Sequence, residues 1–372
     1  MKVPVIVALL AFLSVAVFPS HDVFGQVPEF KSVEVASDRR VTFRFLAPKA
    51  QEVSVVAIEN QPAAPMTRNA DGVWSVTVGP LPPAIYSYAF KVDGAQVTDP
   101  MNPRVKVWLV SNSMVEVPGD PPQATQVQDV PHGVVHAHTY SSKSLGETRG
   151  VIVYTPPGYS PSAAAAFPVL YLLHGFGDDQ RAWTDVGRAH VIADNLIAAR
   201  AIVPLVIVMP YGHGIPPTDR RARGAEWAQN DIRFTRDLLE DVMPFVERSY
   251  RVASDPDHRA IAGLSMGGGQ SLTIGLQRQD LFHWVIGFSS SAPEGDLAAL
   301  FPKVAAAAAF NKESRLLWIG VGKDDFLLKR NQAFDQWLTA TGVTHTYVET
   351  AGAHTWLVWR TYLQDVLPKL FR

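Results

Sequence analysis

The sequence predicts an α/β domain with a doubly wound, mostly parallel sheet, preceded by a small all-β, immunoglobulin-like sandwich. Short β-rich runs separated by turn residues fill residues 28–117, whereas continuous apolar runs alternate with helical segments over residues 127–372. A glycine-rich turn around Ser265 directly follows one of these apolar runs. At 372 residues, the chain is long enough to form both domains.

The first 25 residues have the pattern of a signal peptide. Lys2 gives a minimal positive start, an apolar run extends from Val3 to Phe18, and Val23–Gly25 ends in a small residue suited to cleavage. The run is short for a membrane span, and no other segment approaches one. We therefore expect a secreted or periplasmic protein without stable membrane association; an uncleaved anchor is the alternative.

Residues 28–117 carry the pattern of a β-sandwich. Turn signals such as Asp71-Gly72 and Asp93-Gly94 separate runs rich in β-branched and aromatic residues, which is typical of a sandwich. These runs cover residues 41–46, 53–58, 73–78 and 85–92. Residues 118–126 follow with the proline and glycine content of a linker.

From residue 127 onward, the pattern is that of strands buried on both faces, alternating with helices. Two β-rich segments come first, around residues 133–140 and 150–154. Continuous apolar runs then cover residues 169–173, 205–209, 260–262, 284–288 and 316–321. Helical segments between them include residues 189–200, 234–249 and 268–278. A doubly wound sheet binds ligands at the carboxyl ends of its strands, so the chemistry is expected at that edge.

The composition is that of a globular protein, and it excludes several classes of binding partner and site. The hydrophobic fraction is 47%, the charged fraction is 18% and the net charge is −2. So small a charge gives no electrostatic basis for binding nucleic acid or an anionic membrane surface. The chain has no cysteine, which excludes disulfides, thiolate metal sites and a cysteine nucleophile.

The stretch Gly263–Gly269 is the most informative in the chain. It follows the apolar run 260–262 and precedes a predicted helix, which is the context of a G-x-S-x-G nucleophile elbow. Glycines allow a turn too sharp for residues with a Cβ, so Ser265 can be exposed on a strained bend. The backbone N–H of Met266 would then point to where an oxyanion forms. The pattern predicts a serine hydrolase; an incidental serine at a glycine-rich helix start is the alternative.

A serine nucleophile needs a general base, and the base needs a carboxylate that orients it. In hydrolases with this elbow, the acid and then the histidine follow the serine along the chain. Asp325, three residues after Gly322 at a predicted strand end, is the expected acid, and Asp324 is the alternative. His354, in a loop between a predicted strand and the last predicted helix, is the expected base.

The turn His174–Gly177 follows the first buried strand of the second domain. A His-Gly turn at this place commonly supplies the second oxyanion donor, here the backbone N–H of Phe176. His174 itself is expected to be a structural, hydrogen-bonding residue rather than a base.

Three tryptophans, Trp183, Trp227 and Trp356, are candidate substrate contacts. Indole rings near active-site loops can stack on sugars or on aromatic acyl groups, although packing is the alternative for each. The sequence contains no P-loop, dinucleotide fingerprint or zinc-ligand spacing, so we expect neither a cofactor nor a metal.

Three stretches of the second domain, Leu172–Gly177, Gly187–Ala198 and His258–Ser271, resemble the feruloyl esterase domains of carbohydrate esterase family 1. The similarity extends over nearly all of residues 130–372. It implies an α/β-hydrolase that cleaves esters linking hydroxycinnamic or acetyl groups to plant cell-wall xylan. On that pattern, Ser265, Asp325 and His354 match the nucleophile, the acid and the base.

Residues 40–106 resemble the early-set sandwich modules of carbohydrate-binding family 48. The likeness lies in Gly72–Trp74, Tyr86–Gly94 and Asp99-Pro100. Many such modules are packing partners that bind no sugar, so the resemblance leaves open whether this one does.

Together these observations predict a secreted serine esterase that hydrolyses feruloyl esters on acylated plant polysaccharides or oligosaccharides. An acetylxylan esterase or a general carboxylesterase is the nearest alternative, and a siderophore esterase is a further one. A non-catalytic glycan-binding protein is the alternative from another class. The oligomeric state and the acyl specificity are left open by the sequence.

Overall fold

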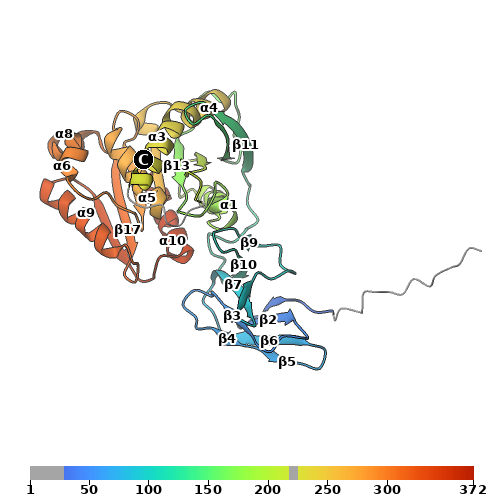
Figure 1. The fold of residues 1–372 in the computed structure, drawn as a ribbon. Coiled ribbons are helices and arrows are strands. Elements are labelled where there is room, and N and C mark those ends of the chain that lie inside the picture. Colours follow the sequence, from blue (N-terminus) through green and yellow to red (C-terminus); the bar gives the residue numbers. More distant parts are fainter. Residues whose placement is uncertain (1–28, 218–224) are drawn as a thin grey trace, which may run out of the picture.

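The computed structural model describes residues 29–217 and 225–372, which form a β-sandwich domain and an α/β domain (Figure 1). The expected signal peptide, residues 1–25, lies outside the described residues. Within the described ranges, no helix combines the length and the apolar character needed to cross a membrane. The predicted fold class is confirmed by the sheets described next.

The sandwich domain consists of two antiparallel sheets with a shared core. One sheet has the order β1-β2-β6-β5 and the other β4-β3-β7-β10-β9, with β8 paired to β7. Phe43 from the first sheet and Tyr88 from the second have ring centroids 4.8 Å apart, and both are fully buried. The strands are β1 (Val33–Val35), β2 (Val41–Leu46), β3 (Val53–Val56), β4 (Ala64–Pro65), β5 (Thr67–Arg68), β6 (Val73–Val78), β7 (Ala84–Val92), β8 (Ala95–Val97), β9 (Val105–Lys106) and β10 (Asn112–Val117).

Strand β7 is buried on both faces, which explains its nearly continuous apolar character. Tyr86, Tyr88 and Phe90 face the sandwich core. Ile85 belongs instead to a hydrophobic cluster of the α/β domain, as does Met114 of β10. Because side chains alternate along a strand, one face of this sheet completes the sandwich while the other packs against the second domain.

The α/β domain is built on one eight-stranded sheet with the order β11-β12-β14-β13-β15-β16-β17-β18. Strand β12 pairs antiparallel with β11 and β14, and all the other pairs are parallel. The strands are β11 (Val134–Ser142), β12 (Glu147–Thr155), β13 (Val169–Leu173), β14 (Val206–Pro210), β15 (Arg259–Leu264), β16 (Trp284–Phe288), β17 (Leu316–Gly322) and β18 (Thr346–Thr350).

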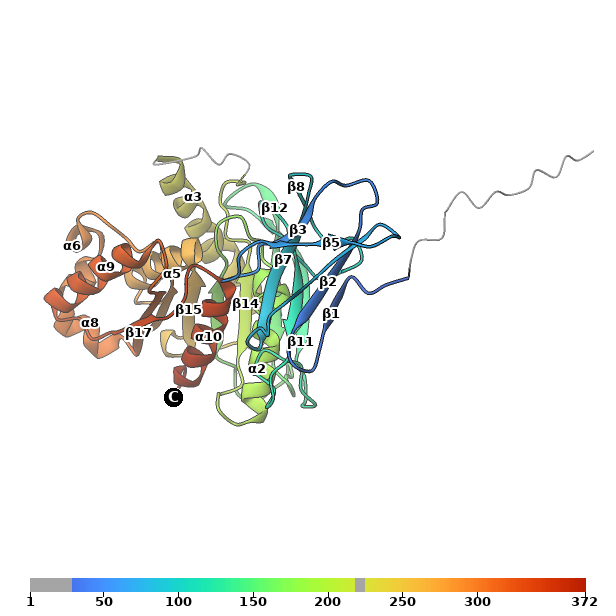
Figure 2. The same cartoon turned by 90° about the horizontal axis from the view of Figure 1, so that it is seen from below.

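Helices cover both faces of this sheet. Helices α1 (Ala182–Asp185), α2 (Ala189–Ala198) and α10 (Trp356–Val366) share a hydrophobic cluster with one face. The opposite face is covered by α3 (Ala225–Arg236), α4 (Met243–Ser249), α5 (Ser265–Gln277), α6 (Leu297–Leu300), α7 (Pro302–Ala305), α8 (Ala307–Glu313) and α9 (Leu328–Thr341). In Figure 2, α6, α8 and α9 lie at the end of the molecule opposite the sandwich strands.

The helix expected over residues 234–249 is present but interrupted. A π-helical segment, Asp237–Val242, separates α3 from α4. Asp237 is completely buried there and accepts hydrogen bonds from Tyr140 and Arg149 of the neighbouring strands. Short 3₁₀ turns occupy Pro256–His258 and Leu367–Lys369.

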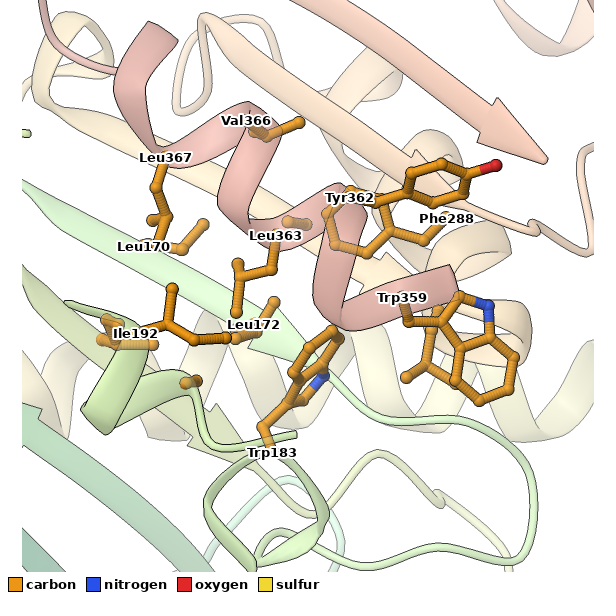
Figure 3. Packing of buried hydrophobic residues seen from close by; sticks show 14 of the residues in the cluster. Leu170, Leu172, Trp183, Ile192, Phe288, Trp359, Tyr362, Leu363, Val366 and Leu367 are labelled. Atoms are coloured by element: carbon orange, nitrogen blue, oxygen red, sulfur yellow. The ribbon is translucent and has the colours of Figure 1, made fainter. Parts of the chain in front are cut away.

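Strand β13 shows why the central strands are almost entirely apolar. Leu170 and Leu172 point to the cluster under α10, where they meet Leu363 and Leu367, as Figure 3 shows. Tyr171 points to the opposite cluster, and all of these side chains are buried. With both faces covered, every position of the strand favours an apolar residue.

Candidate active site

Ser265 lies at the sharp turn where strand β15 ends and helix α5 begins. Its backbone φ is +77°, in a region that residues with a Cβ rarely occupy. The turn is tight enough to require glycines on both sides. A Cβ on Gly263 would lie 2.4 Å from the carbonyl of Gly267, and a Cβ on Gly267 would lie 2.5 Å from the carbonyl oxygen of His174. The predicted strand–turn–helix context of the elbow is therefore present.

Ser265, His354 and Asp325 are joined by hydrogen bonds, although 60 or more residues separate the serine from each partner in the chain. The Nε2 atom of His354 is 2.9 Å from the Ser265 hydroxyl oxygen. On the other side of the ring, Nδ1 lies 2.9 Å from Oδ2 and 3.0 Å from Oδ1 of Asp325. The parallel strands β15, β17 and β18 deliver all three residues to the same edge of the sheet.

The carboxylate at Asp325 is held in its charged form. Burial by itself would raise the pKa of Asp325, but the hydrogen bond and the charge of His354, together with the Leu327 amide, outweigh burial and lower it. The Leu327 amide donates to Oδ1 at 2.8 Å. The neighbouring Asp324 is exposed. Of the two acids considered from the sequence, only Asp325 contacts His354.

The turn His174–Gly177 lies directly beside the serine. A Cβ on Gly175 would come within 3.5 Å of the Ser265 Cβ atom. Met266 is in the first turn of α5, where backbone N–H groups have no partner within the helix. The Phe176 and Met266 amides expected as oxyanion donors thus belong to the two turns that meet at Ser265.

Two buried histidines fix the turn in place without carrying charge. The Nε2 atom of His174 accepts a hydrogen bond from the Gly212 amide at 2.8 Å, and burial lowers the pKa of His174 to about 4. The Nε2 atom of His213 accepts from the Gly177 amide at 3.2 Å, and burial lowers the pKa of His213 to about 3. His174 is therefore a structural residue, in agreement with its predicted role.

A cavity of about 410 Å³ opens onto the serine. Its walls are mainly aromatic, and the ionisable side chains of Lys106, Asp178 and His354 also line it. Residues of both domains take part: Lys106 and Trp108 come from the sandwich domain and the rest from the α/β domain. The lining residues are Lys106, Trp108, Gly175, Phe176, Asp178, Leu264, Ser265, Phe326, His354, Trp356 and Trp359.

The three tryptophans considered as substrate contacts have different positions. The prediction for Trp183 is wrong, because its side chain is only 1% exposed and is absent from the cavity lining. Its indole N–H donates to the Leu173 carbonyl at 2.9 Å, and its ring packs against Trp356 below the cavity. Trp356 does line the cavity. The side chain of Trp227 lies outside the described residues.

Four cavity residues were not considered as contacts from the sequence: Lys106, Trp108, Asp178 and Phe326. Phe326 and Trp359 flank the His354 ring, with centroids 4.5 and 4.9 Å from it. Asp178 could have been noticed, because it closes the His-Gly turn. Nothing in the sequence places Lys106 and Trp108 at a site formed by residues more than 60 positions further along the chain.

Asp178 contrasts with Asp325 although both are buried. Burial raises the pKa of Asp178 to about 7; the positive charge of Lys106 acts in the opposite direction, and the charge of Asp179 adds to the rise. Its Oδ1 atom has no hydrogen-bond partner in the protein. Burial also lowers the pKa of Lys106. Among the residues that the structure describes, no group of three His, Asp or Glu side chains could hold a metal ion.

Comparison with known proteins gives relatives for both domains. Residues 142–370 match the family model described as putative esterase, and residues 30–107 match carbohydrate-binding module 48 (isoamylase N-terminal domain). The endo-1,4-beta-xylanase/feruloyl esterase of Xylanibacter ruminicola is 28% identical over 345 residues, which are 91% of this chain and 46% of that protein. This chain thus spans about half or less of the curated relatives that it matches first.

Two solved structures show what is shared in three dimensions. A ferulic acid esterase is 29% identical with a TM-score of 0.54, over 64% of this chain and 97% of its own. The enterochelin esterase from Shigella flexneri is 19% identical with a TM-score of 0.65, over 91% of this chain and 95% of its own. At that identity the second likeness concerns the fold alone, but its coverage includes both domains.

The likeness of the second domain to feruloyl esterases, noted first from three sequence stretches, is confirmed by these matches. Since the esterase model covers more than half of the chain, the protein belongs to the putative esterase family, with a module-48 match in its sandwich domain.

Proposed function

We propose that this protein is a secreted serine esterase that hydrolyses feruloyl esters on plant cell-wall xylan or xylo-oligosaccharides through an acyl-enzyme. The observation that carries the proposal is the continuous hydrogen-bonded chain from Ser265 through His354 to Asp325, at the floor of an aromatic cavity. This arrangement is the one that activates a serine for acyl transfer.

In the first half of the reaction, His354 Nε2 takes the proton of the Ser265 hydroxyl as its oxygen attacks the ester carbonyl. Asp325 holds the ring through Nδ1 and stabilises the imidazolium that forms. The amides of Phe176 and Met266 donate to the oxyanion of the tetrahedral intermediate. When the intermediate collapses, the ester C–O bond breaks, and the alcohol, the sugar hydroxyl, leaves with the proton from His354.

In the second half, water replaces the alcohol. His354 removes a proton from the water as its oxygen attacks the acyl carbon, and the bond to Ser265 then breaks. The proton returns to the serine oxygen, and the carboxylic acid is released. The lowered pKa of Asp325 supports this cycle, because a charged carboxylate can stabilise the imidazolium that His354 forms in each half of the reaction.

The residues that line the cavity favour an ester substrate with an aromatic acyl group over one with an acetyl group. Trp108, Phe326, Trp356 and Trp359 present aromatic rings, which suit a planar cinnamoyl group. Asp178 lines the cavity and supplies a carboxyl group that suits a hydrogen bond from a phenolic hydroxyl of the acyl group. An acetyl group would leave most of the cavity of about 410 Å³ unfilled.

The polysaccharide part of the proposal has separate support. A curated relative is named both as a xylanase and as a feruloyl esterase, and the sandwich domain matches a carbohydrate-binding module. Secretion is supported by the charge and apolar pattern of residues 1–25.

The test is a comparison of initial rates on methyl ferulate and on 4-nitrophenyl acetate, for the wild type and for Ser265→Ala. We expect a higher kcat/KM on methyl ferulate, and a loss of kcat of about 10⁶-fold on both esters in the variant. Because, within the described residues, the serine hydroxyl forms a hydrogen bond with His354 alone, the variant should keep the melting temperature of the wild type.

Each of the other possible results would lead to a different conclusion about the function. Hydrolysis of the acetate alone would keep the nucleophile and replace the feruloyl specificity by that of an acetyl esterase. Near-normal rates in Ser265→Ala would contradict the mechanism. Binding of xylan by a wild type that hydrolyses neither ester would favour a glycan-binding protein.

A further inference from the structure

The sandwich domain makes a direct contact with the turn that is expected to donate to the oxyanion. The indole N–H of Trp108 donates to the carbonyl oxygen of Phe176 at 2.8 Å. Trp108 belongs to the sandwich domain, and Phe176 precedes the glycine at which the turn adopts a φ of +81°. Other hydrogen bonds between the described parts of the two domains, from Arg188 to Glu116 and from Arg360 to the Ile85 carbonyl, do not involve the oxyanion turn.

The peptide group that follows Phe176 is fixed from both sides. Its carbonyl accepts from Trp108, and its N–H, which belongs to Gly177, donates to His213 Nε2 at 3.2 Å. The indole also lies directly on the glycine: a Cβ on Gly177 would be 2.6 Å from Trp108 Nε1. The orientation of this peptide restricts the direction of the Phe176 N–H. Only the φ and ψ angles of Phe176 separate the peptide from that N–H group.

Trp108 is itself held by a firm connection between the domains. It follows β9, which pairs with β10, and β10 pairs with β7. Ile85 of β7 packs into the hydrophobic cluster of the α/β domain, and its carbonyl accepts from the buried Arg360 of α10 at 3.0 Å. Lys106 also places its ammonium group 5.7 Å from the centroid of the Trp108 ring. Trp108 lies in the short loop between β9 and β10, so the position of the indole depends on the paired strands that anchor this loop at both ends.

We infer that Trp108 is a positioning residue, through which the sandwich domain orients the Phe176 amide for the oxyanion. The domain then contributes to the rate of the chemical step on any ester, including small esters that contain no sugar. This inference rests on the proposed esterase function and on the role of Phe176 within it. It assigns to the domain a role that is independent of carbohydrate binding.

The test uses the full-length chain with Trp108→Phe, which keeps an aromatic ring but removes the N–H donor. We expect kcat for 4-nitrophenyl acetate to fall about 10–100-fold with little change in KM, less than the 10²–10³-fold cost of deleting an oxyanion donor outright. The affinity for phenylboronic acid, whose adduct with a serine places an oxygen at the oxyanion position, should fall by a similar factor.

Trp74→Phe is the matched control. Trp74 lies in the same domain and also donates its indole N–H to a carbonyl, that of Ala47 at 2.9 Å, but it packs in the sandwich core away from the cavity. This variant should lower the melting temperature at least as much as Trp108→Phe, because Trp74 is 7% exposed and Trp108 is 39% exposed. Its kcat and its boronate affinity should be those of the wild type.

A kcat and a boronate affinity that Trp108→Phe leaves unchanged would overturn the inference while the esterase function stands. Equal losses of kcat in both variants would also overturn it, since the effect would then come from weakening the sandwich domain. A wild type that does not hydrolyse 4-nitrophenyl acetate would contradict the proposed function, and the inference would fall with it.

Discussion

Two regions beside the serine each contain a buried carboxyl group, and the pKa values of these two groups are shifted in opposite directions. The catalytic part, formed by Ser265, His354 and Asp325, comes from the α/β domain alone; Ser265 and His354 line the cavity, and Asp325 contacts His354 from outside the lining. The cross-domain wall, formed by Lys106, Trp108 and Asp178, combines both domains. Both oxygens of Asp325 lie within hydrogen-bond distance of His354 Nδ1, whereas Oδ1 of Asp178 has no partner.

The difference shows that burial alone does not set the charge of a carboxyl group. Burial acts to raise the pKa at both positions, but donors reverse the effect at Asp325 and do not reverse it at Asp178. A carboxylate that is fully satisfied by the protein can hold a catalytic base. A carboxyl group that lines the cavity and is not held by a catalytic base, as at Asp178, is suited to bind a group of the substrate. The two parts should therefore affect different kinetic parameters.

The largest effect is expected when the charge of Asp325 is removed, because this carboxylate orients the catalytic base. Asp325→Asn should lower kcat about 10⁴-fold on every ester, because the amide cannot hold His354 in the tautomer that accepts the serine proton. The measurement is kcat on methyl ferulate and on 4-nitrophenyl acetate. Asp324→Asn is the matched control, since this neighbour is exposed, and it should keep most of the activity. The reverse ranking of the two variants would show that the acid is misassigned.

The second effect concerns stability and its dependence on pH. In the folded protein the pKa of Asp178 is about 7, against an ordinary value of 3.8, so the folded state keeps a proton that the unfolded state releases. The contribution of Asp178 to stability should therefore fall as pH rises from about 4 to about 7, by at most about 4 kcal/mol. Lys106 and Asp179 are the charged groups that act on Asp178, with opposite signs.

Asp178→Asn should remove this loss, so that the variant gains stability over the wild type as pH rises through this range. Urea unfolding of both proteins at pH 4.5, 6 and 7.5 measures the difference. A gap between them that does not change with pH would mean that Asp178 ionises normally in the folded protein.

The smallest effect is expected in substrate recognition. If Asp178 accepts the phenolic hydroxyl, Asp178→Asn should raise KM for methyl ferulate roughly tenfold and leave 4-nitrophenyl acetate unaffected. Asp179→Asn is the control, because Asp179 pairs with Arg181 at 2.9 Å and does not line the cavity. Equal changes for the two esters would place Asp178 outside acyl recognition.

Local patterns were enough to predict the fold class and the candidate catalytic residues. Gly263–Gly269 combines a buried strand, a forced turn and a helix start within a few residues, and each of these has a short-range sequence signal. The acid and the base were predicted from the chain order of Ser265, Asp325 and His354. Parallel strands bring their carboxyl ends to one edge of the sheet, so residues that follow different strands can meet there. The position three residues after Gly322 favoured Asp325 over its neighbour, and the structure joins Asp325 to the base.

Contacts between distant segments could not be predicted in this way. Trp183 follows the expected oxyanion turn closely in the sequence, yet it packs beneath the cavity. Helix α1 directs its indole toward the Leu173 carbonyl. Trp108 has no local signal for a catalytic role, and it reaches Phe176 only because β7 and β10 pack against α10.

The sequence by itself therefore determined the two domains, the nucleophile elbow and the order of the catalytic residues, because these depend on local backbone conformation and hydrophobic periodicity. The tertiary structure alone decided which tryptophans face the cavity and that the sandwich domain completes its wall. Those features depend on how two independently patterned surfaces pack, and no short stretch of sequence encodes that packing.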